Sequence, residues 1–220
     1  TDFMLRLTSS ILFGIDDVEM AYRIGRKIDR WVHLNHELGM GAFVADLSIA
    51  NGYGELLEFA TDLESEIQHM IAIRKSNKTG KDALSILLAA HDDEGSISDV
   101  ELVGQAALIF AAAHLTTAHS LTWALFLLAQ HPGAMNRMHG ELSAELDGGF
   151  PSLERVERLA FTDRVIKEAM RILPASSYSQ RITAAPVELG PFNLPPGSGI
   201  VFSQFITHHM PEIYGDPEAF

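Results

Sequence analysis

Cysteine is absent from the 220-residue sequence. Its absence excludes disulfide bonds and thiolate metal sites within these residues, and it is compatible with a reducing compartment. Basic residues are few, since 16 Lys and Arg stand against 29 Asp and Glu, for a formal net charge of −13. They form no basic stripe, so nucleic-acid binding is not expected. Asp2 and Arg6 flank only a short apolar run, so the sequence shows no signal peptide. We expect a cytoplasmic protein, and a membrane anchor in a preceding N-terminal region is left open.

Charged residues are also missing from one long stretch, residues 102–136. The stretch is long enough to span a bilayer. It nevertheless carries many polar side chains, among them Gln105, His114, Thr116, Thr117, His119, Ser120, Thr122 and Gln130. A helix inside a large helical protein can pair such groups internally, whereas lipid cannot. We therefore favour a buried central helix over a membrane span.

Hydrophobic periodicity and capping residues predict helices over the first two thirds of the chain. The first helix stops at Gly14, and the second is capped by Asp16 or Asp17. Residues 39–54 contain several glycines and are interpreted as a long loop that could serve as a lid. Further helices are expected over residues 55–75, 83–90 (capped by Asp82), 134–146, 153–159 and 162–173. Residues 91–96 are read as a turn.

The longest predicted helix begins at a capping box formed by Ser98 and Glu101 and ends before Pro132. At a rise of about 1.5 Å per residue it is roughly 50 Å long. Beyond Pro174, β-branched and aromatic residues alternate with Pro and Gly, which predicts short strands and turns. We expect a mainly α fold with a small β part near the C-terminus, and one partial domain over residues 1–220, helical in 1–173 and rich in strands and turns in 174–220.

Glu168 and Arg171 lie three residues apart in "KEAMRILP", so their side chains share one helix face and can pair. Alone, this spacing is typical of an ordinary surface pair. Arg181 and the segment "VELGPFNLPPGSGIVFSQFITHHMPEIYGDPEAF" follow it. Together, the helix and this segment resemble the E-x-x-R helix and the following strands and meander approach of the cytochrome P-450 superfamily. Residues 82–132 resemble the long central helix of that family and the segment before it.

The resemblance implies a P-450-like helical fold and a haem-dependent monooxygenase. Such an enzyme inserts one oxygen atom of O2 into a small apolar organic substrate. The implied cofactor is haem (iron protoporphyrin IX), and the implied electron donor is a ferredoxin or a flavoprotein. The chain would be an internal fragment of a longer protein, which lacks the family's N-terminal region and its Cys haem-ligand loop.

The resemblance also implies roles for the middle of the long helix, where the family carries a small-small-x-acid-Thr-Thr motif over the haem. Ala112 and Ala113 take the small positions and leave a groove for dioxygen. Thr116, with Thr117 beside it, supplies the hydroxyl that holds the bound oxygen and its water. The alternative reading of Thr116 is a hydroxyl that bonds back to its own helix carbonyl.

Other site residues follow from the same resemblance. Arg181 matches the arginine that pairs with a haem propionate, and Glu168 with Arg171 forms a structural ion pair that braces the core beside the haem. The substrate cavity would be lined by Leu108, Ala111, Leu115, Ser176, Ser177 and Tyr178. The serines and Tyr178 favour a substrate with a hydrogen-bonding group.

Two departures from the family pattern stand out. The 220 residues contain no Cys to act as the axial ligand, and Leu115 occupies the position of the usual acid beside the threonine. A carboxylate there relays protons, so its loss admits a family member that rearranges peroxides without external electrons. A haem-free helical remnant or scaffold is the alternative from a different functional class.

The histidines of the long helix are not expected to bind metal. His114 and His119 are five residues apart and point about 140° away from each other on a helix. His208 and His209 are adjacent and diverge as well, so no zinc site is predicted there. Core histidines hydrogen-bonded to neighbouring groups are the favoured reading.

Overall fold

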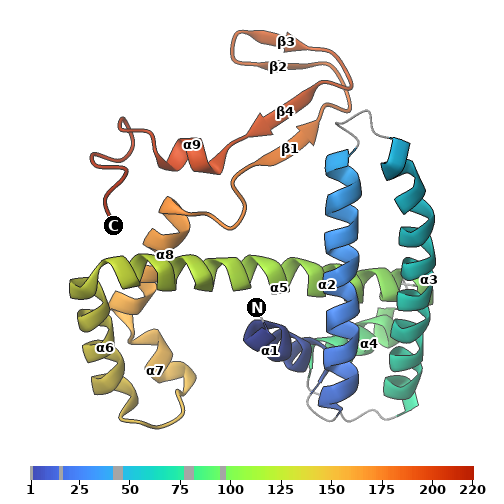
Figure 1. Ribbon diagram of the computed structural model, residues 1–220, viewed down its shortest axis with the longest axis horizontal. Helices are drawn as coiled ribbons and strands as arrows, with labels where there is room; N and C mark the ends of the chain where they lie inside the picture. The colour runs from blue at the N-terminus through green and yellow to red at the C-terminus, as the bar shows by residue number, and fades with distance from the viewer. Residues whose placement is uncertain (1, 15–16, 42–46, 77–81, 95–97) are drawn as a thin grey trace. The chain divides into compact units, whose positions relative to one another are not determined.

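The computed structural model describes residues 2–14, 17–41, 47–76, 82–94 and 98–220. Contacts divide the chain into two compact units, Thr1–Leu115 and Thr116–Phe220, which are called the N-terminal and C-terminal units below. The boundary falls within the longest helix, which continues unbroken from one unit into the other (Figure 1). The fold is mainly α with small sheets near the C-terminus, as predicted.

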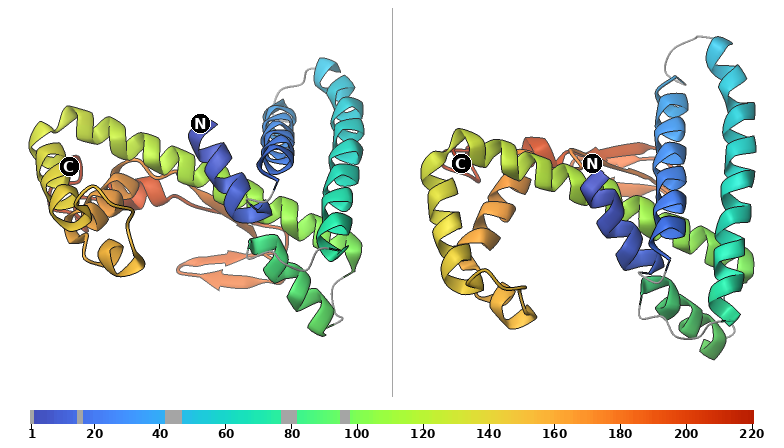
Figure 2. Two further views of the ribbon diagram at one scale, coloured as in Figure 1. Left: turned by 90° about the horizontal axis from the view of Figure 1, so that it is seen from below. Right: turned by 60° about the horizontal axis from the view of Figure 1, so that its bottom comes forward.

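The N-terminal unit is entirely helical in its described residues. Its elements are α1 (Asp2–Phe13), α2 (Val18–Gly41), α3 (Leu47–Ser76), α4 (Ala83–Glu94) and the first half of α5 (Asp99–Gln130). Helices α2 and α3 lie side by side along their length, and α1 packs against α2 (Figures 1 and 2). Their apolar faces close one core, whose most buried members are Ile24, Ile28, Ile67, Met70, Leu102 and Phe110.

The predicted helix ends are confirmed where a local capping group defines them. Gly14 has φ +100° and its N–H bonds to the Ser10 carbonyl at 3.0 Å, which closes α1. Asp17 Oδ1 accepts from the Met20 N–H at 2.9 Å and so caps α2. Ser98 and Glu101 form the expected capping box, with the Ser98 N–H donating to Glu101 Oε2 at 2.7 Å.

The prediction of a long loop over residues 39–54 is wrong at both ends. Helix α2 continues to Gly41 and α3 begins at Leu47, while residues 42–46 lie outside the described part of the chain. A methyl group at Gly52 would stand 3.0 Å from Leu38 Cδ2, so this glycine permits close packing of α3 on α2. Tertiary packing thus outweighs the cost of about 1 kcal/mol that a helical glycine carries. The turn expected over residues 91–96 is likewise wrong for 91–94, which belong to α4.

One buried ion pair joins three elements of the N-terminal unit. Arg74 Nη2 on α3 lies 3.1 Å from Asp82 Oδ2, and the two side chains are only 8% and 6% exposed. The same nitrogen donates to the Phe13 carbonyl at the end of α1, at 2.6 Å. Asp82 Oδ1 in turn accepts from the Ser85 N–H at 2.9 Å and caps α4, as predicted. The pair therefore fixes α1, α3 and the start of α4 to one another.

The C-terminal unit begins with the second half of α5 and ends in short strands. Its further elements are α6 (Pro132–Leu146), α7 (Leu153–Glu157), α8 (Ala160–Ile172), β1 (Ser179–Ile182), β2 (Val187–Leu189), β3 (Phe192–Leu194), β4 (Gly199–Phe202) and α9 (Gln204–His208). Strand β1 pairs antiparallel with β4, and β2 with β3, as two separate two-stranded sheets (Figure 2). Ala124 and Leu127 of α5 pack on Ala169 and Ile172 of α8 in a small core.

Helix α5 also satisfies the length and composition of a membrane span. Its buried side chains include Phe110 and His114 in the N-terminal unit and Leu127 and Leu128 in the C-terminal unit. Only 28% of its most apolar 18-residue window is buried within the described structure, so the core helix stays a prediction.

Candidate functional site

The residues that the resemblance assigns to the oxygen site all lie on α5. Ala112 and Thr116, four residues apart, share one helix face, and both are exposed, as is Thr117. Ala113 and Leu115 are half-buried. This face of α5 therefore presents small side chains beside a hydroxyl and carries no carboxylate at residue 115.

His114 points into the core of the N-terminal unit and is 1% exposed. Its Nε2 atom lies 3.6 Å from Asp29 Oδ1 on α2, and its ring centroid lies 5.7 Å from that of Phe110. His119, by contrast, is exposed. The prediction of a core histidine is therefore confirmed for His114, which lies beside a carboxylate, and is wrong for His119. Within the described residues, no group of three or more His, Asp or Glu side chains could hold a metal ion.

An apolar groove of about 480 Å³ runs between three helices of the N-terminal unit. It is lined by Trp31 of α2, by Ala60, Leu63, Glu64 and Ile67 of α3, and by Val100, Val103, Gly104, Ala107, Leu108 and Ala111 of α5. The structure thus brings Leu108 and Ala111, both predicted to contact substrate, onto the wall of one groove. Its volume falls within the usual range for small-molecule sites.

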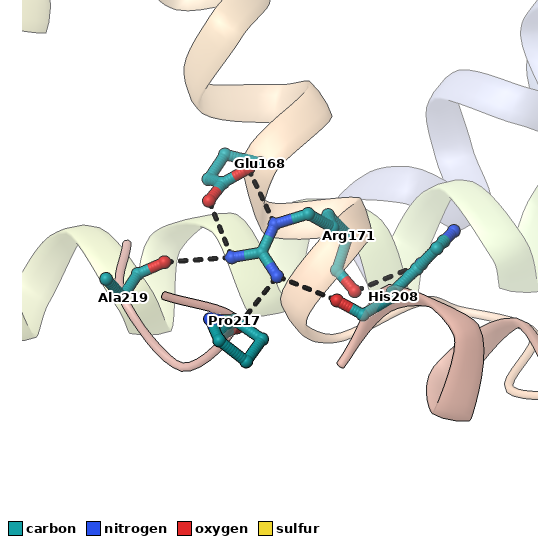
Figure 3. A network of polar contacts seen from close by, with 5 residues as sticks. All are labelled: Glu168, Arg171, His208, Pro217 and Ala219. Atoms are coloured by element: carbon teal, nitrogen blue, oxygen red, sulfur yellow. Dashed lines mark hydrogen bonds and ion pairs between the residues drawn. The ribbon is translucent and has the colours of Figure 1, made fainter. Parts of the chain in front are cut away.

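Arg171 is the centre of the polar network in the C-terminal unit (Figure 3). Its Nε and Nη2 atoms donate to the two carboxylate oxygens of Glu168 at 2.9 and 2.7 Å. Three further bonds reach backbone carbonyls, those of His208 (3.0 Å), Pro217 (2.7 Å) and Ala219 (2.8 Å). A guanidinium group has five N–H donors, and five bonds occupy all of them here. Arg171 thereby ties α8 to the last residues of the chain.

Burial differs between the two partners of this pair. The Arg171 side chain is 9% exposed and that of Glu168 is 37% exposed. The hydrogen bonds that Arg171 donates to Glu168 raise the pKa of Arg171 above its ordinary value, against the desolvation that burial causes. Tyr214 adds a cation–π contact, with the guanidinium carbon 5.0 Å from its ring centroid. Arg171, rather than the carboxylate, is the buried group on which the arrangement depends.

The remaining predicted site residues lie on or next to β1. Arg181 is exposed and donates from Nη1 to the Gln180 carbonyl at 2.8 Å. Within the described part of the chain, its guanidinium pairs with no carboxylate. Ser176, Ser177 and Tyr178 are exposed too, and Ser176 Oγ donates to the Tyr178 carbonyl at 3.1 Å. Their hydroxyl groups and the Arg181 charge are thus available to a ligand, and their roles stay predictions.

Several structurally important residues had no signal in the sequence analysis. Trp31 and Ile67 lie on helices that were predicted, but nothing in their spacing identified a groove wall. Glu141 on α6 accepts hydrogen bonds from the backbone N–H groups of Phe161 and Thr162, each at 2.7 Å, and so caps α8 from outside. These bonds, that of Phe161 first, lower the pKa of Glu141. A cap from another helix leaves no local sequence pattern.

Comparisons with known proteins agree on one family. The sequence profile described as Cytochrome P450 matches residues 1–220. The chain is 40% identical over 162 residues to cyclooctatin synthase of Streptomyces melanosporofaciens, covering 72% of this chain and 35% of that protein. It is 33% identical over 210 residues to pentalenene oxygenase of Streptomyces avermitilis, covering 92% and 45%.

Solved structures match the fold over the whole chain. A retinoic acid-bound cyanobacterial CYP120A1 superposes with a TM-score of 0.83 at 24% identity, covering 100% of this chain and 49% of that one. A zebra fish cytochrome P450 with progesterone gives 0.79 at 20% identity, covering 100% and 55%. The chain therefore spans about half the length of the proteins it matches or less.

Proposed function

The chain belongs to the cytochrome P450 family, and on that basis we propose that the protein containing it is a haem-dependent monooxygenase. Its reaction inserts one oxygen atom of O2 into a small apolar organic substrate. The observation that carries the proposal is the family match over all 220 residues, together with relatives at up to 40% identity.

Several residues of this chain fit the cofactor. Ala112 and Thr116 leave an exposed, small-residue face on α5 where a flat macrocycle could approach, and the exposed Arg181 guanidinium suits a propionate. Haem, when bound, supplies the iron at which dioxygen is activated. No thiolate that could bind the iron is among these residues, because the sequence contains no cysteine. These 220 residues would therefore contribute the small-residue face of α5 and a partner for a propionate, and not the ligand to iron.

Thr116 and Leu115 define how protons could be handled at this face. The Thr116 hydroxyl can both donate and accept a hydrogen bond and can hold a water molecule. The Leu115 side chain can neither donate nor accept a hydrogen bond, so this chain lacks the acid–base group that the family usually places there. Proton supply then depends on the hydroxyl and on ordered water.

The proposed substrate is apolar and contains rings. The groove supports this choice, because ten of its eleven lining residues are uncharged and only Glu64 carries a charge. Relatives point the same way, since one is named pentalenene oxygenase and another cyclooctat-9-en-7-ol 5-monooxygenase. The second name describes a ring alcohol, which agrees with the polar side chains of Ser176, Ser177 and Tyr178.

The proposed electron donor is a ferredoxin or a flavoprotein. Two arginines beside Phe161 on α6 and α8, with one neighbouring carboxylate from Glu141, support docking of an acidic protein. Arg137 and Arg164 place their guanidinium carbons 4.2 and 5.8 Å from the Phe161 ring centroid, and both arginines are exposed. Such docking would weaken with ionic strength, because salt screens charges at the surface.

The full-length protein tests the proposal directly. Reduced protein is treated with carbon monoxide, and we expect the red-shifted Soret band of thiolate-ligated haem. Product formed from an apolar ring compound with a reductant, a ferredoxin system and O2 would establish oxygenation. A protein that binds no haem would support the scaffold alternative, and turnover with organic peroxides alone would support the peroxide-rearranging alternative.

A further inference from the structure

The groove of the N-terminal unit combines one large aromatic wall with small residues. Among the described residues that line it, Trp31 of α2 is the one aromatic side chain. Four of the other lining residues are Gly or Ala and come from α3 and α5, namely Ala60, Gly104, Ala107 and Ala111. Small residues on two helices leave space beside the indole that larger side chains would fill. The free volume is therefore bounded by the indole of α2 on one side and by a mixture of small and larger, mostly aliphatic side chains of α3 and α5 on the others.

The aromatic wall is fixed rather than loose. Trp31 is partly buried and packs against the core of the N-terminal unit. It lies in the interior of α2, ten residues before the helix ends at Gly41. A wall held by core packing selects shape better than a mobile side chain, because little conformational entropy is lost when a ligand binds.

The charge at the edge of the groove is already engaged. Glu64 is exposed, and its Oε1 atom accepts a hydrogen bond from Gln68 Nε2 at 3.1 Å. The Glu64 carboxylate is therefore bonded to Gln68 and exposed to solvent. The rest of the groove surface offers apolar contact to a ligand. Ligand discrimination in such a site rests on shape and on aromatic contact.

We propose that Trp31 is the specificity-determining residue of this groove and selects flat, fused-ring compounds over globular hydrocarbons of similar polarity. An extended ring system can lie against the indole face, whereas a globular one contacts only part of it. The proposal rests on the proposed function, in which the substrate binds in the groove. It adds the shape of that substrate and names the residue that selects for this shape.

The test measures binding to the full-length protein. Phenanthrene serves as the flat probe and adamantane as the globular one, with dissociation constants from equilibrium dialysis. We expect wild type to prefer phenanthrene, and Trp31→Ala to reduce that preference about tenfold, or about 1.4 kcal/mol. Trp31→Phe keeps an aromatic ring and should reduce the preference about threefold. Trp123→Ala, the matched control, removes the other tryptophan of the chain, on α5 outside the groove, and should leave the preference unchanged.

Three results would overturn the proposal. These are an unchanged preference in folded Trp31→Ala, an unchanged preference in Trp31→Phe if the alanine variant does not fold, and an equal loss in Trp123→Ala. Dialysis requires no turnover, so failure here is separate from failure of the monooxygenase proposal, which the carbon monoxide spectrum and product analysis decide.

Discussion

Replacing Arg171 should destabilise the C-terminal unit far more than replacing its partner Glu168. Arg171 makes five hydrogen bonds, two to the carboxylate and three to backbone carbonyls. Its side chain is 9% exposed, whereas that of Glu168 is 37% exposed. The two ends of one ion pair therefore make unequal contributions.

The magnitudes follow from this geometry. Removing one partner of a buried pair costs about 3–5 kcal/mol, so Arg171→Ala should fall in that range. Lysine has a single nitrogen with three donors and cannot reproduce the planar fork, so Arg171→Lys should leave at least two acceptors unpaired and cost about 2–3 kcal/mol. Glu168→Gln keeps the shape and one acceptor, and solvent screens the half-exposed group, so we expect about 1 kcal/mol.

Urea unfolding of the full-length protein measures these differences, with haem content recorded alongside. A second assay addresses the chain end directly. Because Arg171 holds the carbonyls of Pro217 and Ala219, limited proteolysis should cut near these residues sooner in Arg171→Lys than in wild type.

The same helix offers a matched control. Lys167 and Asp163 form an ion pair at 2.7 Å with side chains 69% and 56% exposed. Lys167→Ala should change stability by less than about 0.5 kcal/mol. If Glu168→Gln costs as much as Arg171→Ala, or if Arg171→Lys behaves like the Lys167 control, the reasoning from burial and carbonyl contacts is refuted.

Three further predictions concern other parts of the chain. Gly14→Ala should destabilise the protein by about 2–4 kcal/mol in urea unfolding, because φ is +100° there and a methyl group would stand 1.9 Å from Arg74 Nη2; a neutral effect would contradict it. Glu141→Gln should lose stability near neutral pH but approach wild type below about pH 4.5. The native pKa of Glu141 is lowered from 4.5, so its contribution is present above that pH and is lost as pH falls through the native value; a constant difference across pH would contradict it. Leu115→Glu in the full-length protein should raise product formed per reduced cofactor, because a positioned acid–base group contributes roughly 10²–10⁴ to the rate of the proton-transfer step; unchanged coupling in a folded variant would mean that protons arrive by another route.

The parts of the fold that the sequence predicted are those with local causes. Asp17, Asp82 and the pair Ser98–Glu101 each bond to a backbone group within three residues, so that the cap is visible in the sequence itself. The failures lie where packing decides. At Gly52, close approach to Leu38 keeps a glycine-containing segment helical, and no local rule contains that contact.

In the candidate site, too, local contacts were predictable and contacts between residues distant in sequence were not. The spacing of Glu168 and Arg171 predicted their pairing, because side chains three residues apart lie on the same face of a helix. It could not give the three carbonyl partners of Arg171, the nearest of which is 37 residues further along the chain. The pairing was therefore predictable, and the burial that determines its energetic importance was not.

Residue 115 is a leucine where the family usually has an acid, and Thr116 follows it. The burial of residue 115 shows what a leucine and an acid would each do there. Leu115 is half-buried, so a carboxylate there would be partly desolvated and its pKa would rise. A leucine removes that desolvation cost and adds apolar surface on the same helix as Leu108 and Ala111, which line the groove. A leucine at this position also has no proton to exchange with Thr116. At this position apolar surface and proton delivery are alternatives, and the chain has the apolar residue.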